Sequence, residues 1–168
     1  MDTTVVHFDK FRIVGISERT TNAAETNSAT ARIPGLWKRF YQEGVLEKIP
    51  NRLDPEVIYE AYFDYESDRD GEYSVMIGAE VPADAEVPPS MTSVWLPRSR
   101  YMAFDATGEM PHAVQNAWSR VWNHFDSSNP TPRAYNGDFE RFKLDANGQI
   151  VDCHLYISLA EQGSATGG

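Results

Sequence analysis

The strongest constraint on the fold is an order of predicted elements that occurs twice along the chain. Residues 11–19 (FRIVGISER) are rich in β-branched side chains and predict a strand. Residues 33–49 carry apolar side chains at spacings of three and four, which predicts an amphipathic helix. Residues 57–65 and 73–81 predict the two strands of a hairpin. A strand, a helix and two strands are predicted again at 100–108, 111–125, 138–144 and 151–159.

This repetition predicts an α+β fold made of two similar halves. Each half has one main helix to cover its strands, so the duplicated strand-helix-strand-strand units form one curved antiparallel sheet with a central ligand cleft. We expect a single domain over residues 1–161, with pseudo-repeats at about 5–81 and 91–160 and a disordered tail at 162–168. Residues 20–32 are small and polar without apolar periodicity, and they predict a mobile connecting loop.

The composition favours a globular chain that binds small molecules over one that binds nucleic acid. Four Trp, eight Tyr and eight Phe can build a core and can also form the walls of a pocket for flat or charged ligands. The net charge of −10 opposes direct contact with nucleic acid or an anionic membrane. The same charge attracts cations.

The cysteine and histidine residues predict neither a disulfide nor a metal site. Cys153 is the single cysteine, and the N-terminal residues lack the apolar core of a secretion signal, so we expect a cytoplasmic protein. The sequence has no glycine-rich phosphate loop and no G-x-S-x-G motif, and we expect no cofactor. The histidines do not stand at zinc-ligand spacings relative to Cys153 or to acidic residues; they are His7, His112, His124 and His154.

Glu140 is the strongest candidate for a functional residue in this sequence. It lies in the predicted strand DFERF, where alternation places Glu140 and Phe142 on one face. One interpretation is a residue at the rim of the sheet, paired with Lys or Arg. The other is a buried carboxylate, which costs several kcal/mol unless a partner offsets its charge. A ligand cation can be that partner, and aromatic faces around it would add roughly 0.5–2 kcal/mol each.

The chain resembles the GyrI-like effector-binding domains, the ligand-sensing part of AraC-type and MerR-type multidrug regulators. It most resembles the free-standing, integron-associated members of that group. The matching pieces span most of residues 11–159 and include the helix that carries Trp118 and Trp122. The others are GLWKRFYQEGVLEKIPNR, VIYEAYFDYESDRDGEYSVMIGAEV, RYMAFDATG, DFERF and the final strand.

The resemblance implies a ligand-binding role for Glu140, which stands where similar domains have a ligand-facing glutamate. It also implies pocket positions for Tyr59 and for Phe142, where similar domains often have Tyr, so that Phe142 makes the pocket more apolar. Trp37 lies on the helix that covers the pocket in such domains, and a core role is equally open for it. Trp95 and Phe104 are further candidate wall residues, whereas Trp118 and Trp122 share an apolar helix stripe that favours the core.

These observations favour a non-enzymatic binding protein for a cationic, aromatic or lipophilic small molecule. Two alternatives stay open. The first is a hydrolase of a reactive natural product with Glu140 as general base, because some GyrI-like proteins look like hydrolases. The second is a protein-interaction module like a gyrase inhibitor, in which the acidic surface mimics DNA.

AraC-type and MerR-type regulators carry a separate DNA-binding segment, but the effector-like domain takes up nearly all of this sequence. We therefore expect no direct binding to DNA.

Overall fold

The computed structural model describes residues 3–67, 70–106, 108–109, 112–125 and 132–160. Eight strands within these residues form one sheet. The strands are β1 (Thr3–Phe8), β2 (Phe11–Thr20), β3 (Val57–Phe63), β4 (Tyr73–Val81), β5 (Thr92–Leu96), β6 (Ser99–Asp105), β7 (Asp138–Leu144) and β8 (Ile150–Ser158). The described helices are α1 (Asn22–Glu25), α2 (Ile33–Gln42), α3 (Val45–Lys48) and α4 (His112–His124).

The strand order in the sheet is symmetric about its centre. It runs β1-β6-β8-β7-β3-β4-β2-β5, and every neighbouring pair is antiparallel. The unit β2-α2-β3-β4 and the unit β6-α4-β7-β8 occupy mirrored places in this order, and β3 and β7 meet at the middle. The predicted α+β fold, with a duplicated strand-helix-strand-strand unit and one antiparallel sheet, is therefore confirmed.

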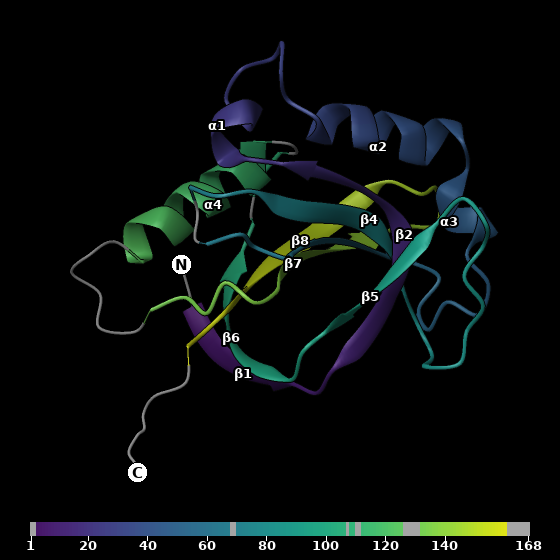
Figure 1. The fold of residues 1–168 in the computed structure, drawn as a ribbon. Coiled ribbons are helices and arrows are strands. Elements are labelled where there is room, and N and C mark those ends of the chain that lie inside the picture. The colour runs from purple at the N-terminus through teal and green to yellow at the C-terminus, as the bar shows by residue number, and fades with distance from the viewer. Residues whose placement is uncertain (1–2, 68–69, 107, 110–111, 126–131, 161–168) are drawn as a thin grey trace.

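The first strand of each half crosses over to the other half. β1 pairs with β6, and β5 pairs with β2, so each outer edge of the sheet is covered by a strand from the opposite repeat. Only two residues separate β1 from β2, and two separate β5 from β6. These short connections require the sheet to curl, and Figure 1 shows its outer strands approaching one another below the helices. β1 was not expected from the sequence, and it lies at the edge.

The two faces of the sheet bury different sets of side chains. One face packs under α2, α3 and α4 and forms the larger core, which includes Leu36, Phe40 and Val121. The other face lines the inside of the curl with side chains such as Tyr59 and Phe139, and no helix residue belongs to that cluster. Because successive strand residues point to opposite faces, the parity of a residue on β3 or β7 decides which core it joins.

The segment predicted as one helix over residues 33–49 is broken in two. Gly44 adopts a left-handed conformation (φ 59°) between α2 and α3, which ends the first helix. The segment predicted as a loop at 20–32 contains α1, whose first turn is capped by a 3.0 Å hydrogen bond from the Ala24 amide to the Thr21 hydroxyl. The predicted tail at 162–168 lies outside the described residues.

Candidate ligand-binding cavity

Two glutamates face each other at the centre of the sheet. In the antiparallel register of β3 and β7, Glu60 is the direct partner of Glu140. Both side chains point to the helix-covered face, and the exposed fractions of the two residues are only 3% and 2%. Like charges placed directly opposite each other destabilise a sheet, so this pair requires a proton, a partner or both.

The hydroxyl group of Tyr62 lies between the two carboxyl groups. It is 2.7 Å from Oε2 of Glu140 and 3.0 Å from Oε2 of Glu60. A phenol has one proton and can donate it to one acceptor only. Both contacts are hydrogen bonds at the same time only if one glutamate is protonated and donates to the phenol oxygen.

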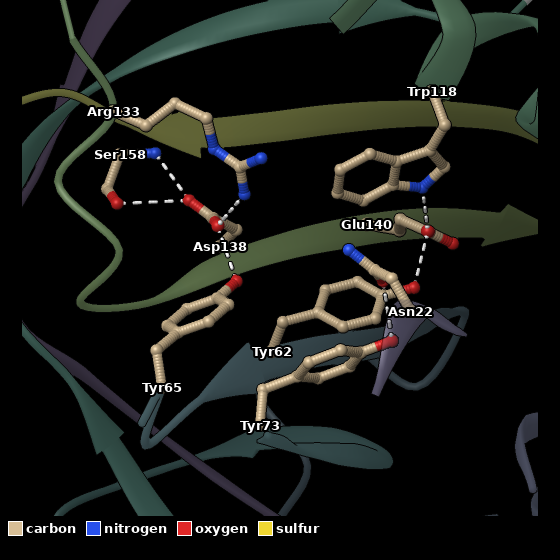
Figure 2. Close-up of polar contacts among 9 residues, drawn as sticks. All are labelled: Asn22, Tyr62, Tyr65, Tyr73, Trp118, Arg133, Asp138, Glu140 and Ser158. Atoms are coloured by element: carbon tan, nitrogen blue, oxygen red, sulfur yellow. Dashed lines mark hydrogen bonds and ion pairs between the residues drawn. The ribbon is translucent and has the colours of Figure 1, made fainter. Parts of the chain in front are cut away.

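Each glutamate also accepts a hydrogen bond from a tryptophan on the helix of its own half. Trp37 on α2 donates its indole N–H to Oε1 of Glu60 at 3.0 Å. Trp118 on α4 donates its indole N–H to Oε2 of Glu140 at 2.5 Å, as drawn in Figure 2. The duplication of the fold thus extends to the polar groups at its centre.

The environment of the pair raises the pKa of both glutamates. Burial raises the pKa of Glu60 well above its ordinary value, and the charge of Glu140 raises it further, against smaller opposite effects of Trp37 and Tyr62. Burial also raises the pKa of Glu140, but hydrogen bonds from Trp118, Tyr62 and Glu60 offset part of that rise. Burial and like charge therefore favour retention of one proton by the pair, which leaves the two carboxyl groups with a single negative charge.

A cavity of about 490 Å³ opens beside this pair. Its walls come from α1, the start of α2, α4, β3, β4, β7 and the connecting segments. The aromatic wall residues are Tyr62, Tyr65, Tyr73, Trp118 and Trp122, and the polar or charged ones are Asn22, Glu25, Glu60, Gln115, Ser119, Arg133 and Glu140. The cavity therefore combines flat apolar surfaces with a buried negative charge, which suits a lipophilic cation.

The segment predicted as a loop at 20–32 forms part of the cavity wall. Its residues Asn22 and Glu25 line the cavity. The Glu25 carboxylate accepts hydrogen bonds from the backbone amides of Arg32 and Ile33, at 2.8 and 3.2 Å, at the start of α2. A carboxylate at this position satisfies amides that have no partner within the helix. Glu25 thereby ties the segment to α2.

Some of the candidate site residues from the sequence meet at this cavity, and others do not. Glu140 lines it. Trp37 and Phe142 lie behind the glutamate pair, where their rings pack edge to face with centroids 5.5 Å apart. Phe142 is 4% exposed and belongs to the core beneath the helices. Neither Trp37 nor Phe142 is among the residues that line the cavity.

The remaining three candidates lie away from the cavity. Tyr59 has the opposite parity to Glu60, so it points into the inner core of the curl, and burial raises its pKa to about 12. Trp95 lies on the edge strand β5, 45% exposed, under the ammonium group of Lys10. Phe104 is buried on β6, where its ring contacts Phe125 next to α4.

Residues that sequence reasoning did not select complete the cavity. Trp118 and Trp122 were assigned to the core stripe of their helix, but both line the cavity and Trp122 is 41% exposed. Glu60 and Tyr62 are not among the residues that the sequence analysis selects. Glu60 is the single charged residue in the strand VIYEAYF, and this interruption of an apolar strand is the signal that could have found it.

The described residues contain no group of three or more His, Cys, Asp and Glu side chains arranged to hold a metal ion. Among the same residues, none of the helices has the length and apolar character needed to cross a membrane.

The fold and its cavity are those of an effector-binding domain. The chain belongs to the Cass2 family, described as integron-associated effector binding proteins, whose family model matches residues 4–159. The predicted resemblance to free-standing, integron-associated effector-binding proteins is thereby confirmed.

Three relatives illustrate the likeness. An integron cassette protein from the mobile metagenome of Vibrio cholerae is 30% identical, with 94% of this chain and 95% of that chain covered and a TM-score of 0.75. YobU of Bacillus subtilis, named as a candidate transcriptional regulator, is 27% identical over 157 residues, which cover 92% of this chain and 96% of YobU. SAV2435, solved with tetraphenylphosphonium bound, is 24% identical and shares the fold, with 95% and 94% covered and a TM-score of 0.74.

Proposed function

We propose that this protein binds lipophilic organic cations in the cavity beside Glu60 and Glu140. The observation that carries the proposal is a buried pair of carboxyl groups at the cavity wall that no cationic side chain in the described part of the chain balances. Among the described residues, no Lys or Arg side chain forms an ion pair with either glutamate. A ligand cation would supply the missing positive charge.

The energetics of the site favour a cation with apolar substituents. An unbalanced buried carboxylate costs several kcal/mol, so a cation that reaches the pair gains more than it would at an exposed carboxylate. The rings of Tyr62, Tyr73, Trp118 and Trp122 would contact its apolar groups, and each well-placed aromatic face adds about 0.5–2 kcal/mol. Such a site selects charge and shape and needs few directed hydrogen bonds.

The family and one protein of the same fold support this proposal. The family is described by effector binding, and SAV2435 was solved with a lipophilic cation bound. Tetraphenylphosphonium is therefore the first probe for this chain. Because it has no hydrogen-bonding group, it tests the charge and the aromatic walls alone.

The proposal is tested by calorimetric titration of tetraphenylphosphonium into the wild type, Glu140→Gln and Glu47→Gln. Glu47 lies exposed on α3 and does not line the cavity, so its variant removes one negative charge at a distance from the site. We expect Glu140→Gln to weaken binding at least tenfold and Glu47→Gln to change it less than twofold. Equal affinities of the wild type and Glu140→Gln would refute the proposal.

A second candidate function, hydrolysis of a reactive ligand, is favoured by the proton shared between the two carboxyl groups. Paired carboxyl groups with separated pKa values can serve as acid and base. Water could then add to an epoxide, opening the ring to a diol. Incubation with para-nitrostyrene oxide and mass spectrometry would distinguish the two functions. Diol formed by the wild type and not by Glu140→Gln would favour hydrolysis, whereas unchanged epoxide with both proteins favours binding.

A further inference from the structure

The cavity has a second polar anchor, the ion pair of Arg133 and Asp138. Nη2 of Arg133 lies 2.8 Å from Oδ2 of Asp138, and the two side chains are 5% and 0% exposed. Arg133 lines the cavity, whereas Asp138 does not. The guanidinium group of Arg133 therefore forms part of the cavity wall, and the carboxylate of Asp138 lies behind that wall.

Asp138 is fully engaged by protein donors. Besides Arg133, it accepts hydrogen bonds from the Tyr65 hydroxyl at 2.5 Å and from the backbone amide and hydroxyl of Ser158 at 2.7 and 3.0 Å. These bonds hold the carboxylate in place and, through it, fix the guanidinium group. Figure 2 shows this cluster on the opposite side of the view from Glu140 and Trp118.

Arg133 has more donors than the described residues accept. A guanidinium group has five N–H donors, and among the described residues Asp138 accepts a hydrogen bond from one of them. Within the part of the chain that the structure describes, the buried Nε has no partner. The other terminal nitrogen points away from Asp138, toward the side of the view where Trp118 lies (Figure 2). A buried donor without an acceptor is unfavourable, so an acceptor at this wall would be stabilising.

The position of this anchor relative to the glutamates follows from the strand. Asp138 and Glu140 are two residues apart on β7 and point to the same face, about 7 Å apart along the chain. In Figure 2, Arg133 and Asp138 lie on one side, and Glu140 and Trp118 lie on the other, with the rings of Tyr62 and Tyr73 between them. One ligand of moderate size can therefore reach both groups.

The balance of charge decides which acceptor fits. Asp138 already neutralises the charge of Arg133, so this end of the cavity offers spare hydrogen-bond donors and no spare positive charge. A carboxylate on the ligand would add an unbalanced negative charge to a buried site, which is costly. A carbonyl oxygen would accept the hydrogen bond without that cost.

We propose that Arg133 is a second ligand-binding residue and that the cavity prefers lipophilic cations carrying a neutral carbonyl acceptor. This inference rests on the proposed cation binding and names the ligand class more closely. The cationic centre lies beside Glu60 and Glu140, and the carbonyl oxygen accepts a hydrogen bond from the guanidinium group of Arg133. The rings of Tyr62 and Tyr73 lie along the part of the ligand between them.

The test compares three triphenylphosphonium ligands that differ in one chain. They carry n-hexyl, 3-methoxycarbonylpropyl, which has the same chain length and a carbonyl group, or 3-carboxypropyl. Calorimetry with the wild type should rank the ester first, about tenfold tighter than the hexyl compound, since 1.4 kcal/mol corresponds to a factor of ten. The carboxylate should bind no more tightly than the hexyl compound. An ester that binds no better than the hexyl compound would overturn the inference.

Two variants assign the preference to Arg133. Arg133→Lys keeps the charge beside Asp138 but removes the planar group with its second nitrogen. The double variant Arg133→Met/Asp138→Asn removes both charges and so leaves no uncompensated buried charge. We expect the ratio of the two affinities to change, so that the tenfold preference for the ester over the hexyl compound falls to less than threefold in both variants. If the ester keeps its full advantage in both variants, the inference is wrong.

The outcomes separate the two proposals. If the phosphonium ligands bind the wild type with equal affinity and Glu140→Gln weakens all of them, cation binding stands and the role of Arg133 fails. If none of the three binds the wild type, cation binding itself fails, and the role of Arg133 fails with it.

Discussion

Glu60 and Glu140 are direct cross-strand partners at the middle of the eight-stranded sheet. Each belongs to one half of the duplicated fold, and each accepts a hydrogen bond from a tryptophan on the helix of that half. A purely structural pair of this kind would be unfavourable, because burial and like charge both oppose ionisation. The arrangement is reasonable for a site that is completed by a positive ligand.

The free protein should become more stable when Glu60 loses its carboxyl group. The pKa of folded Glu60 lies above the ordinary value that holds in the unfolded chain. Between these two pKa values the folded protein binds more protons, so its stability falls as the pH rises through this window. Glu60→Gln cannot ionise but keeps a donor and an acceptor. We expect it to raise the free energy of unfolding by about 1–3 kcal/mol at pH 8 and by much less at pH 5.

Urea denaturation of the wild type, Glu60→Gln and Glu47→Gln at both pH values measures this effect. The neighbouring Tyr62, Tyr73 and Cys153 have pKa values raised by burial above their ordinary ones, so they stay neutral across this range. If Glu60→Gln lowers the free energy of unfolding by the same amount at both pH values, Glu60 has a conventional structural role.

The two tryptophans that donate to the glutamates should differ in their effect on ligand affinity. Trp118 both lines the cavity and donates to Glu140, whereas Trp37 donates to Glu60 from behind it. Trp118→Phe should weaken tetraphenylphosphonium binding about tenfold, since it removes indole surface and a hydrogen bond to the charged carboxylate. Trp37→Phe should weaken it less than threefold. Calorimetry measures both affinities, and a larger loss of affinity in Trp37→Phe than in Trp118→Phe would contradict the assignment of the cavity.

Tyr59→Phe should leave ligand binding intact. The Tyr59 hydroxyl lies on the inner face of the curl, where it donates to Glu80 and accepts from Arg141, both at 3.1 Å. Losing these bonds should lower the free energy of unfolding by about 1 kcal/mol. The affinity for tetraphenylphosphonium should change less than twofold. A tenfold loss of affinity in a protein of near-normal stability would mean that the ligand site extends to the other face of the sheet.

The architecture could be predicted from the sequence because apolar periodicity and turn residues determine it locally. The order of strand, helix and hairpin appears twice in the spacing of apolar side chains, and β7 was predicted with the bounds Asp138–Leu144 that the structure has. The pairing of β1 with β6 and of β5 with β2 could not be predicted in this way. It depends on contacts between residues far apart in the chain, and an edge strand carries a weak local signal.

The candidate site could be predicted only in part, because the sequence does not determine which residues of β3 share a face with Glu140. The aromatic neighbours of Glu140 and the family resemblance both point to Glu140. The resemblance also implies Tyr59 on β3, but Glu60 and Tyr62 are the β3 residues that reach the cavity. Parity relative to Glu140 requires the register of β3 against β7, which long-range packing sets. Trp118 looked like a core residue because an apolar helix stripe can face a core or a cavity.

The most direct test of the shared proton is a count of protons released when the cation binds. Below the raised pKa of the pair, a bound cation favours loss of the proton that Glu60 and Glu140 share, so affinity should rise with pH. Tetraphenylphosphonium is titrated at pH 6.5 in buffers of different ionisation enthalpy. We predict release of a substantial fraction of one proton per ligand from the wild type and almost none from Glu60→Gln. Tight binding to the wild type without proton release would contradict a shared proton between Glu60 and Glu140.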